Sequence, residues 1–235
     1  MSFSAFAGVE LKVGIRSRVY PLYMVVALFY GLILRAVPEA YKITASQLLL
    51  FMEPALIGFT FVGALILFEK KDGVLSALAV SPAEFRNYYW SKTLLMAFLS
   101  IVAAVVMIVI GVGVSTRYFY AFWGVVLTSI VYTLIGVGLV AKHKSLDDYF
   151  IVLLGVLIIS ILPFLGFHNI IENDIINKIL YIIPSYSSIY LLRAGFVSVA
   201  MEKIVFSSAY LLIWIPISYH FAKIRFYKYA VEGAK

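Results

Sequence analysis

The side chains best able to do chemistry in this chain are a few ionisable groups set in long apolar segments. Glu53 is the strongest single candidate, because an ionisable group inside a membrane-spanning segment is costly and usually serves a function. It could contact a cationic substrate, carry a proton or pair with Arg35. It could also lie at the level of the lipid headgroups, since Pro54 indicates that a helix is only beginning there.

The sequence lacks the common motifs for nucleotide binding, metal binding and catalysis. It has no Gly-x-x-x-x-Gly-Lys-Ser/Thr phosphate loop, no His-Glu-x-x-His motif and no cysteine. The three histidines, His143, His168 and His220, are isolated and do not predict a shared metal site. Asp147 and Asp148 are interpreted as helix-capping residues, because two acids suit the positive end of a helix dipole. We therefore expect no catalytic residue and no cofactor bound by this chain itself.

The most informative stretch is the polar segment between two apolar blocks at 69–84, which we call the elbow. Its charged start, its glycine and its Ser-Pro restart predict a structured loop that contains a short helix. Val74, Leu75 and Leu78 recur at helical spacing, so this helix would show one apolar face. That face could lie on lipid headgroups or dock into a groove on a soluble partner. In the second case Val74, Leu75 and Leu78 would fit the groove of the partner, and the charged residues before them would set the register: Glu69, Lys70, Lys71 and Asp72.

The composition is that of an integral membrane protein. Of the 235 residues, 63% are hydrophobic and 13% are charged, whereas a soluble domain holds about 25% charged residues. The net charge is +7, which in a soluble protein would suggest nucleic-acid binding. Here the charges lie between apolar blocks, so we interpret them as topology signals and expect no nucleic-acid partner.

Apolar runs of roughly 20 residues, the length needed to cross a bilayer, predict six transmembrane helices in one domain at 1–235. They are expected at 19–37, 48–68, 90–114, 119–141, 149–167 and 204–222. Most of the 19 Lys and Arg residues fall on the side that both termini share. Because basic residues concentrate on the cytoplasmic side, we expect a multi-pass protein of the cell membrane with both termini in the cytoplasm.

Two shorter helical regions accompany the predicted spans. Residues 1–18 predict a helix at the membrane interface, with an apolar side that Glu10 interrupts. Between the last two spans, 168–203 holds two apolar stretches separated by Pro184 and Ser185. Neither stretch can span a bilayer, so they form either two half-length helices that dip in from outside or an amphipathic pair on the surface.

These features together resemble the permease subunits of type-2 ABC exporters. In that family the loop between spans two and three typically reads Glu, basic residues, Gly, Leu-x-x-Leu and Ser/Thr-Pro. The matching residues are Glu69, Lys70, Lys71, Gly73, Leu75, Leu78, Ser81 and Pro82. The family's outer hairpin often contains a Pro-Ser/Thr-Tyr turn, matched by Pro184, Ser185 and Tyr186. The resemblance covers nearly the whole chain, and the Tyr-Pro-Leu-Tyr at 20–23 is similar to permeases of the fluoroquinolone-export subfamily.

The resemblance implies an all-α integral membrane fold with six transmembrane helices, an N-terminal interfacial helix, a cytoplasmic coupling helix and a broken outer hairpin. Two permease subunits, identical or paralogous, would pair within membrane lipid. Two ATPase subunits beneath them would bind ATP and Mg²⁺, so this chain would not itself be an enzyme. Their closure would pass through the coupling helix at 72–80 and drive export of a hydrophobic or amphipathic substrate by alternating access.

Three other classes remain open at this point. An ion-coupled secondary transporter would use Glu53 as its coupling group. A membrane-embedded enzyme would need convergent polar groups at one depth, and the sequence does not indicate any. A membrane anchor for a signalling ATPase would keep the elbow but would need no substrate path.

Overall fold

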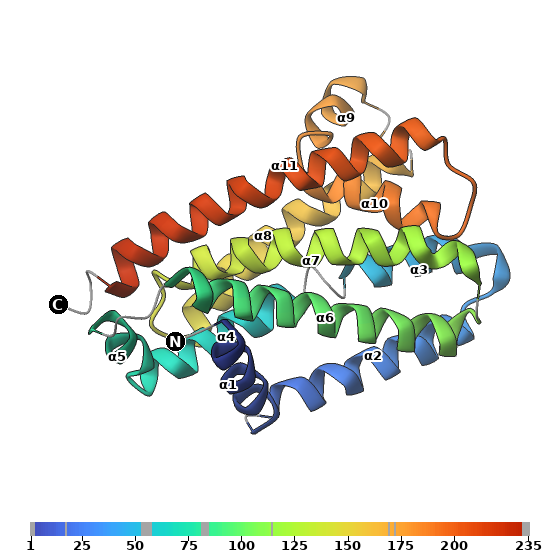
Figure 1. The fold of residues 1–235 in the computed structure, drawn as a ribbon. Coiled ribbons are helices and arrows are strands. Elements are labelled where there is room, and N and C mark those ends of the chain that lie inside the picture. The colour runs from blue at the N-terminus through green and yellow to red at the C-terminus, as the bar shows by residue number, and fades with distance from the viewer. Residues whose placement is uncertain are drawn as a thin grey trace.

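The structure is a computed structural model that describes residues 3–16, 18–52, 58–80, 85–113, 115–168, 170–171 and 173–231. The regular elements within these ranges are helices, and the long ones form an elongated bundle (Figure 1). The α-helices are α1 (Phe3–Arg16), α2 (Val19–Ala36), α3 (Glu39–Met52), α4 (Phe59–Lys71), α5 (Val74–Val80), α6 (Phe85–Gly111), α7 (Phe119–Val140), α8 (Leu146–Phe167), α9 (Asp174–Leu180), α10 (Pro184–Ala194) and α11 (Met201–Phe226). A short 3₁₀ turn, Thr116–Tyr118, precedes α7, and a π-helical turn, Tyr227–Val231, follows α11.

Within the described residues, five helices are long and apolar enough to cross a membrane. They are α2, α6, α7, α8 and α11, and each corresponds to one predicted span. The Ser145 hydroxyl accepts the backbone N–H of Asp148 at 3.2 Å and caps the start of α8. The cap is therefore Ser145, and Asp147 and Asp148 lie in the first turn, where two acids suit the helix dipole.

The second predicted span, at 48–68, is not described as one continuous helix. The chain instead forms two helices, α3 and α4. Helix α3 begins at Glu39, nine residues before the predicted start of the span at residue 48. The break before α3 is local, because Pro38 pushes Val37 into an extended conformation with ψ of 131°. At 1.5 Å per residue, α3 and α4 are each only about 20 Å long, whereas the hydrocarbon core is about 30 Å thick.

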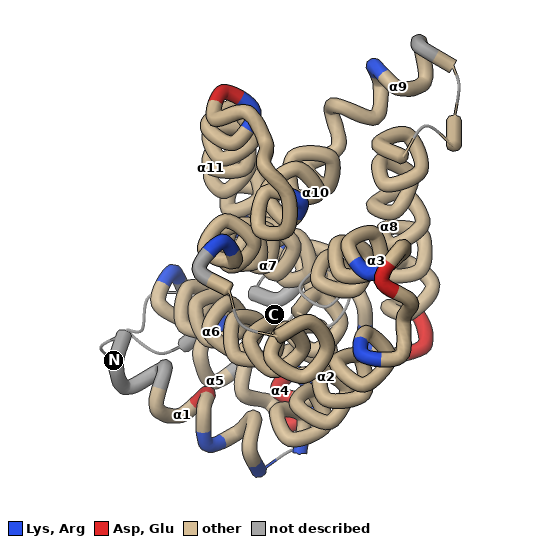
Figure 2. The backbone as a smooth tube through the Cα atoms, turned by 90° about the vertical axis from the view of Figure 1, so that its right-hand side faces the viewer, with Lys and Arg blue, Asp and Glu red and all other residues tan. Residues whose placement is uncertain are grey.

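Helix α7 lies at the centre of the bundle when the molecule is seen end-on (Figure 2). It packs against α4, α6, α10 and α11 and is the most buried of the five long helices. Hydroxyl groups join it to its neighbours: Ser100 Oγ lies 3.1 Å from both Tyr23 Oη and Ser129 Oγ. The Thr128 hydroxyl donates to Ser188 Oγ at 2.8 Å. Such bonds between helices add to van der Waals packing where lipid supplies no hydrophobic driving force.

Helix α1 turns sharply away from α2 and packs against α2 and α6. Arg18 makes this turn with a φ of 62°. The packed side of α1 contains Glu10, while Val9 and Ile15 are about half exposed, at 50% and 54%. Glu10 interrupts the apolar side of α1 because that side faces the protein, where Glu10 is buried.

The region between the last two spans contains two short helices, α9 and α10, which differ in their packing. Helix α10 is buried among α3, α7, α8 and α11. Helix α9 projects beside the bundle and packs mainly on α8, leaving Ile175 and Ile179 exposed (Figures 1 and 2). The two helices therefore lie in different environments, because α10 is packed inside the protein and α9 lies on its surface.

Candidate functional site

Four side chains from three helices form a buried ionic cluster beside the elbow. The members are Glu10 of α1, Glu69 of α4, and Tyr88 and Lys92 of α6. The Lys92 ammonium donates to Glu10 Oε2 and to Glu69 Oε1, both at 2.6 Å. The Tyr88 hydroxyl donates to Glu69 Oε2, and Lys92 Nζ lies 4.8 Å from the centre of the Tyr88 ring. Because Tyr88 and Lys92 are four residues apart, they share one face of α6.

The ionic cluster is almost fully shielded from solvent, so water screens its charges poorly. Lys92 has no exposed surface, and Glu10 Oε1 has no hydrogen-bond partner among the described residues. Burial is the main cause that raises the pKa of Glu10, with attraction to Lys92 opposing it and repulsion from Glu69 adding to it. Two carboxylates share one ammonium here, and a proton on Glu10 would remove the excess negative charge.

Lys70 fixes the end of α4 to the loop that follows α7. Its ammonium donates to the carbonyl oxygens of Ala141 at 2.9 Å and His143 at 3.0 Å. These carbonyls lie just beyond the C-terminal end of α7, where the helix dipole favours a cation. Partial burial lowers the pKa of Lys70, and repulsion from Lys144 adds to that shift. Glu69 and Lys70 therefore hold the start of the elbow inside the protein, although both were expected to contact a partner.

The short helix predicted within the elbow is present as α5, but its apolar side faces inward. Leu75 and Leu78 are 3% and 9% exposed and belong to the main hydrophobic core. Helix α5 packs against α4 and against the turn Tyr227–Val231. Leu75 and Leu78 thus contact the chain's own core, whereas they were expected to dock into a partner. Amphipathic spacing grouped them with Val74, which is 45% exposed, and it could not tell which surface would cover each side chain.

Among the described side chains of the elbow, the exposed ones are Lys71, Asp72, Val74 and Ala77, which we call the elbow surface. Gly73 lies within it and adopts a φ of 72°, a conformation that lets α4 end and α5 begin in a new direction. Next to this surface, a cavity of about 470 Å³ opens between the end of α4 and the start of α8. Its lining residues are Leu67, Phe68, Lys70, Lys71, Lys144, Ser145 and Leu146.

Three predicted site residues, Glu53, Ser81 and Pro82, lie outside the described residues. Among the residues that are described, no three His, Asp or Glu side chains come together as metal ligands would.

The predicted turn of the outer hairpin, Pro184, Ser185 and Tyr186, forms the first turn of α10. Pro184 occupies the first helical position, where its lack of an N–H leaves no extra donor unsatisfied. Tyr186 contacts the rings of Tyr181 and Tyr190, with centroid distances of 4.2 and 5.4 Å. The turn therefore starts a buried helix and presents an aromatic side chain to a cavity.

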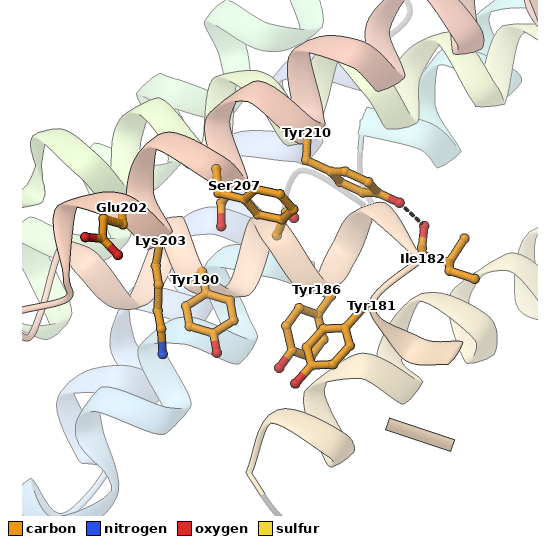
Figure 3. Close-up of a pocket in the computed structure, with 10 residues that line it drawn as sticks. Tyr181, Ile182, Tyr186, Tyr190, Glu202, Lys203, Ser207 and Tyr210 are labelled. Atoms are coloured by element: carbon orange, nitrogen blue, oxygen red, sulfur yellow. Dashed lines mark hydrogen bonds between the residues drawn. The ribbon is translucent and has the colours of Figure 1, made fainter. Parts of the chain in front are cut away.

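That cavity, which we call the hairpin pocket, has a volume of about 640 Å³ and lies between the α9–α10 hairpin and the first turns of α11 (Figure 3). Its lining residues are Tyr181, Ile182, Tyr186, Ser187, Tyr190, Glu202, Lys203, Phe206, Ser207 and Tyr210. The Tyr210 hydroxyl donates to the carbonyl oxygen of Ile182 at 2.6 Å and so joins α11 to the hairpin (Figure 3).

The sequence analysis did not identify the residues that complete the ionic cluster or the hairpin pocket. Tyr88 and Lys92 carried one available signal, because they are four residues apart at the start of a long apolar helix. Glu10 carried another, because it stood alone on an otherwise apolar helical side. Lys203 and Phe206 lie on successive turns at the start of the last predicted span, where they resembled ordinary boundary residues.

Comparison with known proteins identifies the family. The model of the fluoroquinolones export permease protein family matches residues 2–234. Two curated relatives are fluoroquinolones export permease proteins of Mycobacterium tuberculosis, from strains CDC 1551 / Oshkosh and ATCC 25618 / H37Rv. Each is 28% identical over 229 residues, which cover 95% of this chain and 94% of the relative. The match extends through the five long apolar helices, the elbow and the α9–α10 hairpin, and this multi-pass chain therefore belongs to the fluoroquinolones export permease protein family.

Proposed function

We propose that this chain is the membrane-spanning subunit of an ATP-driven ABC exporter and that a separate ATPase chain binds and hydrolyses ATP with Mg²⁺. The substrate is a hydrophobic or amphipathic molecule, and the name of the family makes fluoroquinolones the first candidates. A second permease subunit, identical or paralogous, would complete the path through the lipid bilayer. In this arrangement both termini and the elbow face the cytoplasm of the cell membrane.

The observation that carries this proposal is the anchoring of the elbow to the transmembrane helices. Glu69 is ion-paired to α6 through Lys92, at 2.6 Å, and Lys70 is hydrogen-bonded to the end of α7. The apolar side of α5 is packed into the same core. A force applied to the elbow would therefore displace α6 and α7 directly, instead of bending a free loop.

The six-span arrangement belongs to the same proposal. Helices α3 and α4 would together form the second span, since each alone is too short to cross the hydrocarbon core. An even number of spans places α1 and the C-terminal end of α11 on one side. Figure 1 agrees with this, because α1, α5 and the end of α11 lie at the same end of the bundle.

The elbow surface is the part of the chain that would contact the ATPase. Val74 is 45% exposed and supplies an apolar contact, while Lys71 and Asp72 beside it are exposed and charged. The neighbouring cavity contributes Lys144, so the combined surface is mainly basic. Such a surface favours a partner whose groove has an acidic rim.

The test is co-purification of the tagged chain in mild detergent, with partners identified by mass spectrometry. We expect a stoichiometric protein with a phosphate-binding loop, and we expect Val74→Asp to lose it while keeping a normal elution volume. Leu78→Asp should instead yield a misfolded or aggregated chain, because it places a carboxylate in the core.

Lys12→Asp is the matched control, because Lys12 is exposed on α1 and is not part of the elbow surface. It should keep the ATPase. A wild-type chain that purifies without any ATPase, or a Val74→Asp variant that retains the partner in full, would contradict the proposed contact.

A further inference from the structure

We propose that the hairpin pocket binds a planar aromatic amphiphile that carries a carboxylate, with its rings against Tyr190 and Phe206 and its carboxylate on the Lys203 ammonium. This inference rests on the proposed function in one respect, since it treats the ligand as the exported substrate. It adds a site and a substrate chemistry that the elbow cannot supply.

The size and lining of the hairpin pocket suit a small aromatic ligand. A volume of about 640 Å³ falls within the range of roughly 300–1,000 Å³ usual for small-molecule sites. Five of the ten lining side chains are aromatic, and Ile182 is the one branched aliphatic side chain among them. A lipid acyl chain would be better matched by an aliphatic groove, whereas ring faces and edges favour a flat, conjugated molecule.

Four polar groups of the pocket lie on one side of it. In Figure 3 the hydroxyl ends of Tyr181, Tyr186 and Tyr190 and the ammonium of Lys203 point to the same side. Phe206 also lines the pocket, from α11, and 69% of its surface is exposed. A ligand with one polar edge would match the four polar groups, and its ring face would contact Phe206.

Lys203 is suited to hold an anion. Its ammonium lies 5.4 Å from the centre of the Tyr190 ring, so the chain is directed along the pocket wall. No carboxylate among the described residues forms an ion pair with it, although Glu202 is its neighbour in sequence. An incoming carboxylate could therefore take a charge-assisted hydrogen bond from Lys203 without displacing an internal partner. Glu202, which also lines the mouth, is placed to contact a basic amine on the same ligand.

The test measures binding to the purified chain in phosphatidylcholine nanodiscs, without ATP and without any ATPase. Norfloxacin, a fluorescent fluoroquinolone with a carboxylate and a basic amine, is titrated by fluorescence anisotropy. We expect Phe206→Ala to weaken binding about fivefold through lost ring contact. We expect Lys203→Met to weaken it about tenfold through the lost charge-assisted contact.

The ethyl ester of norfloxacin separates the carboxylate contact from general effects on the pocket. The wild-type chain should bind the ester about tenfold more weakly than the acid, and Lys203→Met should bind the two equally. Tyr41→Ala and Lys178→Met are matched controls, because both side chains are exposed and lie outside the pocket. Both should bind norfloxacin as the wild type does.

Three results would overturn the assignment: no saturable binding, unchanged affinity in both pocket variants, or equal wild-type affinity for acid and ester. Each would exclude this pocket while leaving the ATPase co-purification unaffected, because no step in the binding assay needs the elbow. Conversely, loss of the ATPase partner would contradict ATP-driven export without changing the norfloxacin titration.

Discussion

One lysine at each end of the bundle has a distinct role, and the two differ in their burial. At the elbow end, Lys92 is fully buried and holds Glu10 and Glu69 at 2.6 Å. At the hairpin end, Lys203 is exposed at the mouth of a cavity. The first arrangement fixes three helices in one geometry, whereas the second leaves a charge available to something outside the chain.

This difference has a physical basis in desolvation. A buried ammonium is tolerated only when carboxylates replace the water that it has lost. Once formed, such a cluster is costly to break, so the helices that carry it move together. An exposed ammonium retains its water and can exchange it for a ligand at little cost. We infer that the elbow end is suited to transmit motion and the hairpin end to bind and release.

The largest expected effect comes from removing the buried cation. Lys92→Met leaves Glu10 and Glu69 facing each other without their shared cation, although the Tyr88 hydroxyl still donates to Glu69. Breaking a buried ion pair in this way costs about 3–5 kcal/mol. We expect a correspondingly lower free energy of unfolding, measured by SDS titration in mixed micelles. A variant as stable as the wild type would mean that the ionic cluster does not hold the helices together.

Two further variants sharpen this measurement. Lys12→Met removes an exposed lysine from α1 and should change stability by less than about 0.5 kcal/mol. Adding Glu10→Gln and Glu69→Gln to Lys92→Met removes the unpaired charges and should recover most of the lost stability. Failure of this triple variant to recover would attribute the loss to packing instead of charge.

A smaller effect is expected at the hairpin end, from Tyr210→Phe. This change deletes the hydrogen bond to the carbonyl oxygen of Ile182, which is worth about 1 kcal/mol. Because that bond joins α11 to the exposed turn at 181–182, we expect faster amide hydrogen exchange at 180–186 and little change elsewhere. Tyr41→Phe, at an exposed tyrosine of α3, is the control. Uniformly faster exchange over the whole bundle would mean that the hairpin end and the elbow end do not differ in rigidity.

Much of the scaffold is predictable from local sequence. Runs of about 20 apolar residues leave few alternatives to a membrane span, and five of the predicted spans have their counterparts in α2, α6, α7, α8 and α11. Helix starts are also local, because Ser145 caps α8 and Pro184 begins α10. The second span was harder to predict, because hydropathy does not indicate whether one apolar run forms one helix or two.

The sites depend on contacts between distant residues, which no local pattern contains. Glu10 and Lys92 are 82 positions apart, and Lys92 and Glu69 are 23 positions apart. The periodicity of Leu75 and Leu78 gives the apolar side of a helix but not the identity of the surface that covers it. In the same way, Lys203 and Phe206 come to line a pocket only when α10 and the turn before it pack against α11.

The smallest expected effect is a pH dependence of the unfolding free energy from the elbow end, because it arises from one carboxyl group. Burial raises the pKa of Glu10 above its ordinary value of 4.5, more than attraction to Lys92 lowers it. The fold therefore binds a proton at Glu10 more tightly than the unfolded chain does. The bound proton therefore stabilises the fold. This contribution is fully present below about pH 4.5 and is lost as the pH rises through the raised pKa of Glu10.

The measurement is the difference in unfolding free energy between Glu10→Gln and the wild type, followed from pH 4 upwards. Glutamine cannot ionise, so the difference should move in favour of the variant as the pH rises and then become constant. Its slope should stay below about 1.4 kcal/mol per pH unit, the limit for one proton. Glu39→Gln, at an exposed carboxylate, is the control variant. If the Glu10→Gln difference moved the opposite way, the Lys92 attraction would outweigh burial, and the ionic cluster would hold Glu10 as a charged carboxylate.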